Sequence, residues 1–219
     1  MHTEQVYAST TLLERLALAA ALCAGWGYST LALFAPDRWH AISGEDVGPE
    51  FLSPFALIAT AVASFYVALL RRRGWARIPL ILFSLFCLFA AGEEVSWGQR
   101  IFDRQATGIF AERNVQHETN LHNFIPPPWD GILGGILVFG FLLSPLIRKQ
   151  PLGLQIRNLG VPWPQPRHSW VLSAAIFPLI LLALFDRLGL EEAGELAAIF
   201  VALAVVVQTC TPRACGGSA

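Results

Sequence analysis

The sequence predicts an all-α integral membrane protein: a bundle of six transmembrane helices with both termini in the cytoplasm and a polar 28-residue extracytoplasmic loop (102–129) packed on the bundle. The first observation is composition, since 54% of the 219 residues are hydrophobic and only 14% are charged, whereas soluble domains average about 25% charged residues. The second is a set of long apolar stretches, and the third is the distribution of basic residues between them. We expect a single domain over residues 1–219.

Each predicted span has close to the roughly 20 residues that a helix needs to cross the hydrocarbon core of a bilayer. The first opens on Thr11 and Glu14, which have the spacing of a capping box. The second opens on Ser53 and Pro54, which fit an N-cap followed by proline in the first turn. The fifth contains Pro178, which predicts a kink. In order, the spans are 12–34, 52–70, 78–97, 131–147, 169–186 and 191–209.

The distribution of charge predicts the orientation. With a cytoplasmic N-terminus, the cytoplasmic segments hold ten of the fifteen Lys and Arg residues and only two of the sixteen acids, Glu4 and Glu14. The opposite side then holds five arginines and fourteen acids. Cytoplasmic loops carry the excess of Lys and Arg, so both termini are predicted to lie inside. The net charge of −1 indicates no nucleic-acid partner, and the predicted partner is the lipid bilayer.

The third span carries two adjacent acids before it reaches water. Glu93 and Glu94 lie about 23 Å along the predicted helix, short of the far edge of a hydrocarbon core about 30 Å thick. Charges at this depth are costly, and they mark functional sites by default. On a continuous helix, one face is shared by Glu93, Ser96, Trp97 and Arg100, while Glu94 points about 100° away from it.

The following segment, ERNVQHETNLHNF at 112–124, is dense in polar side chains. As a helix, it would align Asn114, Glu118 and His122 in one stripe. As an extended segment, it would also bring Gln116 and Asn120 to the same face. Both interpretations place Glu118 beside His122, where the two side chains can bind one metal ion or share a proton. We expect this loop to fold down onto the bundle.

A third acidic segment begins the last span. Glu191 and Glu192 suit the positive end of the helix dipole, so they are interpreted first as ordinary residues of a helix N-terminus. Glu195 lies one turn deeper on the same face. It is therefore the better candidate for a site shared with the third span and the polar loop.

The motifs EEVSWGQ (93–99) and NVQHETNLHN (114–123) resemble those of a family of uncharacterised multi-pass bacterial membrane proteins. These proteins carry E-E-x-S-W-G-Q, then N-x-Q-x-E-x-N-L-H-N, and an acidic start to a later helix. The resemblance covers about a sixth of the chain. It implies a site formed by these segments and a location in the bacterial inner membrane, and it implies no particular reaction.

The first functional hypothesis is a metal-assisted or acid/base hydrolase or transferase that acts on a lipid-linked substrate at the outer leaflet. Its predicted catalytic residues are Glu93, Glu94, Glu118 and His122. Glu94, Glu118 and His122 are the predicted ligands of a divalent metal, since oxygen and nitrogen donors suit zinc, manganese or iron. The predicted substrate-binding residues are Ser96, Gln99, Arg100, Asn114, Gln116, Asn120, Asn123 and Glu195.

Two other functions use the same residues differently. In the second, the chain is a structural or accessory membrane subunit, and the polar cluster is a hydrogen-bonded lock between loop and bundle. In the third, the carboxylates are proton or cation sites of a transporter or sensor. The inner halves of the predicted spans are apolar, so the sequence offers no continuous polar path for transport.

Overall fold

The computed structural model describes residues 11–42, 48–71, 74–99, 101–124, 140–147, 150–159, 161–183 and 190–208. These residues form helices, turns and connecting segments, and no strand occurs among them. The predicted all-α class is therefore confirmed for the described part of the chain.

The first apolar run is a single helix with one wide turn. It consists of α1 (Leu12–Leu22), the π-helical turn η1 (Cys23–Gly27) and α2 (Tyr28–Phe34). At its start the Thr11 hydroxyl oxygen accepts the backbone N–H of Glu14 at 3.1 Å, so the N-cap half of the predicted capping box is confirmed. The other half is not formed, because the Glu14 carboxylate accepts from Arg167 and His168 instead. At its end Ala35 leaves helical geometry (φ −143°) because Pro36 follows. The short helix α3 (Pro36–Ile42) begins there.

Helix α4 spans Gly48–Arg71 and includes Pro54 in its interior. The predicted start at Ser53 is wrong, because the helix begins earlier, at Gly48. The Ser53 hydroxyl donates backward to the carbonyl of Pro49 at 3.0 Å, and its side chain does not cap the helix.

Helices α4 and α5 form an antiparallel hairpin. The 3-10 turn η2 (Gly74–Arg77) leads into α5 (Ile78–Glu94). Two serine hydroxyls cross the interface: Ser64 donates to the carbonyl of Leu80 at 3.1 Å, and Ser84 donates to that of Ala61 at 2.8 Å. Hydrogen bonds of this kind join helices where the surroundings are apolar.

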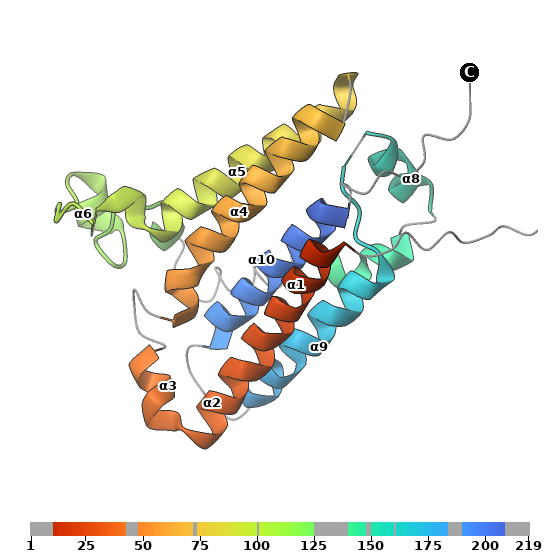
Figure 1. The fold of residues 1–219 in the computed structure, drawn as a ribbon. Coiled ribbons are helices and arrows are strands. Elements are labelled where there is room, and N and C mark those ends of the chain that lie inside the picture. The colour runs from red at the N-terminus through yellow and green to blue at the C-terminus, as the bar shows by residue number, and fades with distance from the viewer. Residues whose placement is uncertain are drawn as a thin grey trace, which may run out of the picture.

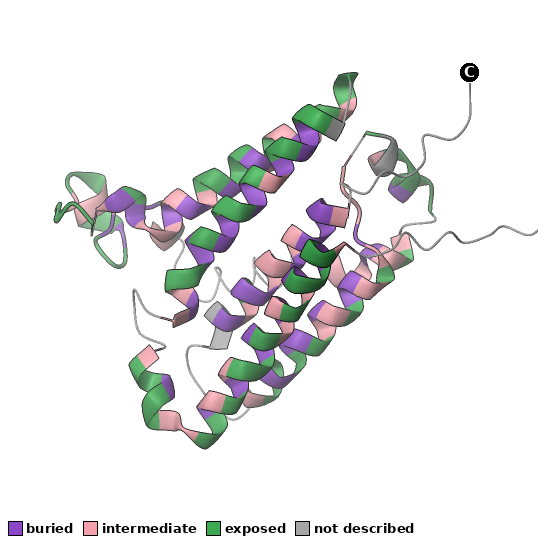
Figure 2. Ribbon diagram, in the orientation of Figure 1, coloured by how far each residue is buried: buried purple, intermediate pink, exposed green. Residues whose placement is uncertain are grey.

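Helix α10 (Leu190–Gln208) lies at the centre of the fold. It packs against α4 on one side and against α1 and α9 (Pro166–Ala183) on the other, as Figure 1 shows. The short α8 (Pro151–Asn158) precedes α9. Figure 2 shows buried residues along the facing sides of these helices and exposed ones on the outside. The main core cluster consists of Ala21, Ala24, Ala56, Leu172, Ala175, Ile176, Leu196, Ala197 and Val201.

Three described helices are long and apolar enough to cross a membrane: Leu12–Phe34, Gly48–Leu70 and Gly74–Glu94. The predicted fifth and sixth spans are apolar helices with shorter qualifying stretches, Pro166–Leu182 and Ala193–Gln208. Of the fourth, residues 140–147 are helical and 131–139 lie outside the described residues. The total of six spans and their orientation stay predictions.

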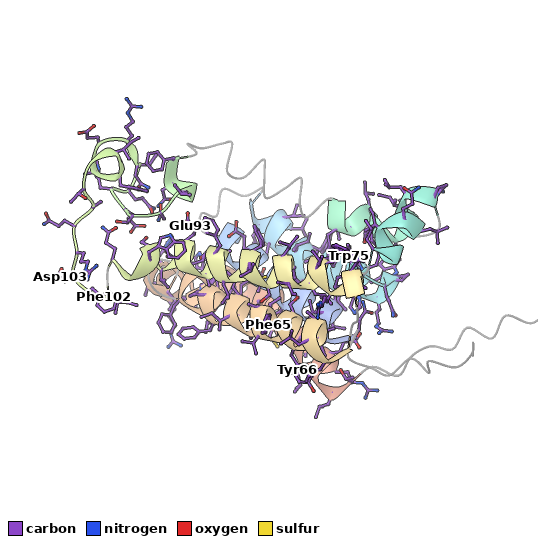
Figure 3. All side chains as sticks on the ribbon, turned by 90° about the horizontal axis from the view of Figure 1, so that it is seen from above. Phe65, Tyr66, Trp75, Glu93, Phe102 and Asp103 are labelled. Carbon is purple, nitrogen blue, oxygen red and sulfur yellow. The ribbon has the colours of Figure 1, made fainter. Side chains whose placement is uncertain are left out.

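The ends of these helices alternate between two sides of the bundle. The start of α1, the end of α4, and the starts of α5 and α9 lie at one end in Figure 1, together with the end of α10. Figure 3 shows Trp75 at this end and Glu93, Phe102 and Asp103 toward the other, while Phe65 and Tyr66 project from the outer face of α4. The predicted basic and acidic sides therefore correspond to opposite ends of the helices.

Candidate functional site at the end of helix α5

The backbone leaves α-helical geometry directly after Glu94 and forms a turn with left-handed residues. Helix α5 ends there, and Ser96 and Trp97 both have positive φ, at 45° and 54°. Such angles are uncommon for residues with a side chain and cluster at functional or strongly constrained sites. The predicted continuation of the helix to residue 97 is therefore wrong.

Trp97 folds back over the last turn of α5. Its Nε1 donates a 2.6 Å hydrogen bond to Oε1 of Glu93, and its ring packs edge-on against Phe89 at 5.6 Å between centroids. The space is available because residue 92 is glycine: a Cβ there would come within 3.0 Å of the indole. The sequence spacing predicts Glu93 and Trp97 on one face of a continuous helix. In the structure the same two side chains are in contact, but across a turn.

Glu93 also holds the polar loop. The backbone N–H of Leu121 donates to its second oxygen, Oε2. The Glu93 side chain is buried, so these donors offset the cost of removing a carboxylate from water. One carboxylate thus ties the helix end, the left-handed turn and residue 121 together.

Glu118 is the second buried carboxylate of the loop. Its Oε2 accepts hydrogen bonds from the Ser96 hydroxyl at 2.7 Å and the Asn120 side-chain amide at 2.8 Å. A third donor is the Asn123 amide, at 3.3 Å. Asn120 additionally donates to the Ser96 hydroxyl oxygen at 2.9 Å, which completes a closed triangle of Ser96, Glu118 and Asn120. We call Glu93, Glu118 and these donors the carboxylate lock.

Asn114 shapes the loop that carries Glu118. Its Oδ1 accepts the backbone N–H groups of Gln116 and Glu118 at 3.1 and 3.0 Å. Its amide donates to both the carbonyl and the side-chain oxygen of Asn120, each at 2.9 Å. Asn114 and Asn120 are only 2% and 1% exposed, so both amides are structural parts of the loop interior.

Gln99 joins the two motifs from the other side. Its Oε1 accepts the N–H of Thr119 at 2.5 Å, and its amide donates to the carbonyl of His117 at 3.4 Å. His117 itself has φ +56°. Its Nδ1 lies 2.7 Å from the carbonyl of Ala111 and must carry a hydrogen, because a carbonyl can only accept. Gln116 accepts from the Asn123 amide.

Neither predicted conformation of 112–124 is correct. Helix α6 (Ile109–Arg113) ends before Asn114, and the 3-10 turn η4 (His122–Phe124) closes the segment. Between them lies an irregular loop, in which Asn114, Glu118 and Asn120 are buried while Gln116 is exposed. Side-chain hydrogen bonds to the loop's own backbone replace those of a regular element.

Three other predicted site residues are not part of the carboxylate lock as described. Glu94 belongs to a different set of carboxylates, because the charges of Glu195, Glu50 and Glu93 act on it. The predicted site shared by α5, the polar loop and the start of α10 stays a prediction. Arg100 and the side chain of His122 lie outside the described residues, so their predicted roles stay predictions.

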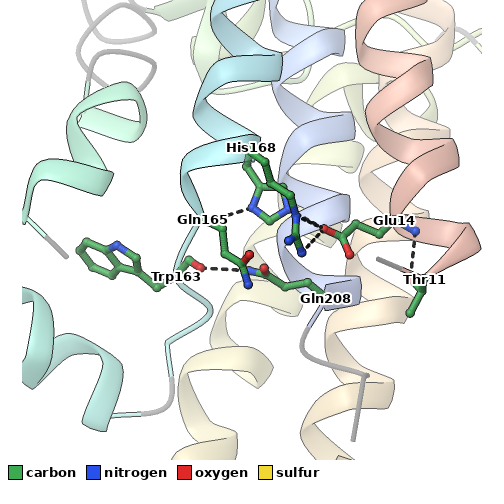
Figure 4. A network of polar contacts seen from close by, with 7 residues as sticks. Thr11, Glu14, Trp163, Gln165, His168 and Gln208 are labelled. Carbon is green, nitrogen blue, oxygen red and sulfur yellow. Dashed lines mark hydrogen bonds and ion pairs between the residues drawn. The ribbon is translucent and has the colours of Figure 1, made fainter. Parts of the chain in front are cut away.

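Sequence reasoning missed a second polar cluster at the opposite end of the bundle. Figure 4 shows Glu14 of α1 against the start of α9. Glu14 is fully buried, and its Oε1 accepts from Nη2 of Arg167 at 2.7 Å and from Nε2 of His168 at 2.9 Å. The N–H of Gln165 donates to Nδ1 of His168, so the hydrogen of this ring is on Nε2. The sequence contains a signal for this cluster, because all these residues lie on the predicted cytoplasmic side.

The carboxylate lock is well suited to holding a loop, and less suited to binding a metal ion. To bind a metal ion, the Glu118 carboxylate would have to offer oxygen lone pairs, and its Oε2 already accepts three protein donors. Among the described side chains, no three His, Cys, Asp or Glu groups come together in a way that could hold a metal ion.

Comparisons with protein-family models, curated proteins and solved structures find no match to this chain. The resemblance to the multi-pass bacterial family therefore remains a prediction that depends on the two sequence motifs.

Proposed function

We propose that the chain is a structural or accessory subunit of a bacterial inner membrane, with six spans and cytoplasmic termini, that presents residues 95–124 as a fixed extracytoplasmic recognition segment. The observation that carries the proposal is the carboxylate lock. Glu93 and Glu118 are buried, and both accept hydrogen bonds from the chain's own side chains and backbone. Such a network holds the loop in one conformation. Its carboxylates stabilise that conformation and do not serve as reacting groups.

The segment held by the lock has the composition of a recognition surface. Its exposed side chains include both large apolar groups and charged groups. The large apolar groups are Trp97, Ile101, Phe102, Ile109, Val115 and Leu121. The Arg104 guanidinium lies 5.5 Å from the centre of the Phe102 ring, which is a cation–π contact. Aromatic residues and arginine are enriched where proteins bind partners.

The hydrolase or transferase hypothesis retains one specific observation. Glu94, with Glu50 and Glu195 close enough for their charges to act on it, is a group of carboxylates outside the lock. In that hypothesis these carboxylates would supply an acid or base. His122 and Arg100 would have to join them.

Limited proteolysis tests the proposal. Arg104 and Arg113 are exposed trypsin sites within the held segment. Glu118→Gln replaces an accepting carboxylate oxygen by an amide N–H₂ group that faces the donors of Asn120 and Asn123. Because donors then face donors, the loop should loosen, and trypsin should cleave faster at both arginines. Glu112→Gln is the matched control, because Glu112 is exposed in the same segment and its change should leave cleavage unaltered.

Metal analysis separates the two functions. Zinc, manganese or iron bound in a one-to-one ratio to the purified chain, and lost in Glu118→Gln but retained in Glu112→Gln, would overturn the structural proposal in favour of the enzyme. Accelerated cleavage in Glu118→Gln, with no metal bound in the unaltered chain, would support the lock.

A further inference from the structure

Exposed apolar side chains line one face of α5 along its length. These residues, spaced i, i+3, i+4 and i+7, are Leu82, Leu85, Phe86 and Phe89. The opposite face packs on α4, where the buried Ser84 donates to the carbonyl of Ala61. Helix α5 belongs to the stretch Gly74–Glu94, which is long and apolar enough to cross a membrane. An exposed apolar face on such a helix is suited to lipid chains.

Trp97 extends this exposed face beyond the end of the helix. Its ring packs edge-on against that of Phe89, and the residue is itself 53% exposed. The only polar atom of the side chain, Nε1, is used in the hydrogen bond to Glu93. The part of Trp97 that remains exposed is therefore apolar carbon next to the exposed ring of Phe89.

The turn after Trp97 carries two more exposed apolar side chains, Ile101 and Phe102. The N–H of Phe102 donates to the carbonyl of Gly98 at 3.0 Å, and a Cβ at residue 98 would come within 3.0 Å of the Phe102 ring. Gly98 has φ +79°, a conformation that favours glycine. The turn and the seat of the Phe102 ring therefore both depend on this glycine.

The length of the apolar stretch places this turn at the surface of the hydrocarbon core. Gly74–Glu94 contains 21 residues, which as a helix extend about 31 Å, and the core is about 30 Å thick. The turn therefore begins where the head-group region begins. Figure 3 shows Phe102 and Asp103 beyond this end of α5, opposite Trp75. Tryptophan is enriched at this depth of a bilayer.

Arg104 adds a positive charge beside the Phe102 ring. Its guanidinium lies 5.5 Å from the ring centre and forms no ion pair within the described part of the chain. Its N–H donates to the carbonyl of Gln99 at 2.9 Å, and the Gln99 side chain accepts from Thr119 of the polar loop. A guanidinium matches the geometry of a phosphate, and phosphate is the anionic group in the head-group region of a phospholipid bilayer.

We propose that the turn after α5 binds phospholipid, with Trp97, Ile101 and Phe102 inserted among the head groups and Arg104 on a lipid phosphate. This inference rests on the proposed function, because the carboxylate lock holds Trp97 through Glu93. It assigns a lipid partner to the first part of the recognition segment. The segment is thereby seated on the leaflet at the polar-loop side of the bilayer.

A fluorescent label measures whether Phe102 enters the leaflet. Phe102→Cys is made in a full chain whose four cysteines are replaced by alanine, labelled with a nitrobenzoxadiazole dye and reconstituted in phosphatidylglycerol nanodiscs. Lipids with a doxyl quencher just below the head group should quench the label, and iodide in the water should have little effect. Glu112→Cys, at an exposed position of the same segment, is the control and should be quenched by iodide. Equal quenching of both labels by iodide would overturn the proposal.

Lipid titration of the full chain in maltoside micelles tests Arg104. Phosphatidylglycerol should raise the melting temperature, since a ligand that binds only the folded state stabilises it. A diacylglycerol with the same chains lacks the phosphate and should raise it less. Arg104→Gln should increase the phosphatidylglycerol concentration needed for half of the rise about tenfold, as expected for the loss of a hydrogen bond between charged groups. Arg113→Gln, at another exposed arginine of the segment, should leave that concentration unchanged.

Two results of this titration would show the proposal to be wrong. If Arg104→Gln responds as the unaltered chain does, the lipid binds elsewhere. If inorganic phosphate raises the melting temperature as much as phosphatidylglycerol does, Arg104 belongs to a site for a free anion.

Trypsin cleavage in micelles without phospholipid separates this inference from the proposed function. Accelerated cleavage in Glu118→Gln, together with a Phe102→Cys label that iodide quenches, would keep the lock and refute the lipid contact. Unaltered cleavage in Glu118→Gln would refute the lock itself, and with it the basis of the lipid contact.

Discussion

Gly25 touches the backbone of Ala175, so that α9 and the first apolar helix meet without a side chain between them. Beside this contact, Nε1 of Trp26 donates to the carbonyl of Ala174 at 3.0 Å. Small residues let membrane helices approach closely, where they gain dispersion contacts and polar contacts between backbones. This close contact holds the first apolar helix against α9, and it fixes the orientation of the π-helical turn η1 relative to α9.

Gly25→Ala should therefore destabilise the chain strongly, by at least the roughly 1–3 kcal/mol that overpacking costs. Gly27→Ala, two residues later, meets open space and should stabilise by about 0.5–1 kcal/mol, since alanine favours helix over glycine. Thermal unfolding in micelles measures both. Equal effects of the two substitutions would show that the close crossing is absent.

Trp97→Phe should loosen the left-handed turn after α5 while keeping an aromatic ring over Gly92. The change removes the Nε1 hydrogen bond to Glu93, and hydrogen bonds to charged groups contribute about 1.5–3 kcal/mol. Trypsin cleavage at Arg104 should increase as a result. Trp170→Phe is the control, since Trp170 is 74% exposed; a similar effect there would argue against a specific role of the indole N–H.

Asn114→Asp should disrupt the loop as much as Asn114→Ala does. Aspartate keeps the oxygen that accepts the N–H groups of Gln116 and Glu118, but it cannot donate to Asn120, and it adds a charge beside Glu118. An unsatisfied buried polar group costs about 1–3 kcal/mol. Hydrogen exchange of residues 114–123 measures the loss of order, with Gln105→Ala, an exposed position in the same segment, as reference.

Arg167→Ala should lower stability by about 3 kcal/mol or more, because removing one partner of a buried ion pair leaves the other charge in apolar surroundings. Glu14 would retain only His168 of its two basic partners, while its Oε2 already accepts no hydrogen bond. Arg38→Ala, at an exposed arginine, should change the melting temperature little. Rescue of Arg167→Ala by the additional change Glu14→Leu would confirm that the unpaired carboxylate is the cause.

Cysteine labelling in intact cells tests the predicted orientation. Gln105→Cys, in the exposed polar loop, should react with a membrane-impermeant maleimide from outside. Trp75→Cys replaces a side chain that is 85% exposed at the other end of α5 and should react only after the membrane is opened. The reverse pattern would place the arginine-rich turn outside and invert the whole topology.

The sequence predicts the apolar helices well because their signal is local. Length and composition suffice for 12–34 and for the hairpin, and the spacing of Thr11 and Glu14 identifies a true N-cap. The errors occur at helix ends. Ser53 and Pro54 look like a start from their residue types, yet α4 tolerates Pro54 inside, since a proline disturbs only the bonds of its own turn.

The sequence predicts which residues form the site, but it does not predict how their side chains and backbone are arranged. The two motifs identify nearly all members of the carboxylate lock, because buried polar groups must find partners and few others are available on that side. The irregular path of 114–121 follows from specific bonds of Asn114 and Gln99 to the backbone, which have no periodic signature. The pairing of Glu14 with Arg167 spans 153 positions, beyond any local pattern.

That same separation has a consequence for biogenesis. Glu14 lies in α1, whereas Arg167 and His168 lie at the start of α9 and are synthesised 153 and 154 positions later. Until they arrive, the acid near the start of α1 has no basic partner from this cluster, and it must stay close to water or to the insertion machinery. We therefore expect α1 to reach its final depth late, once the nascent chain has delivered α9.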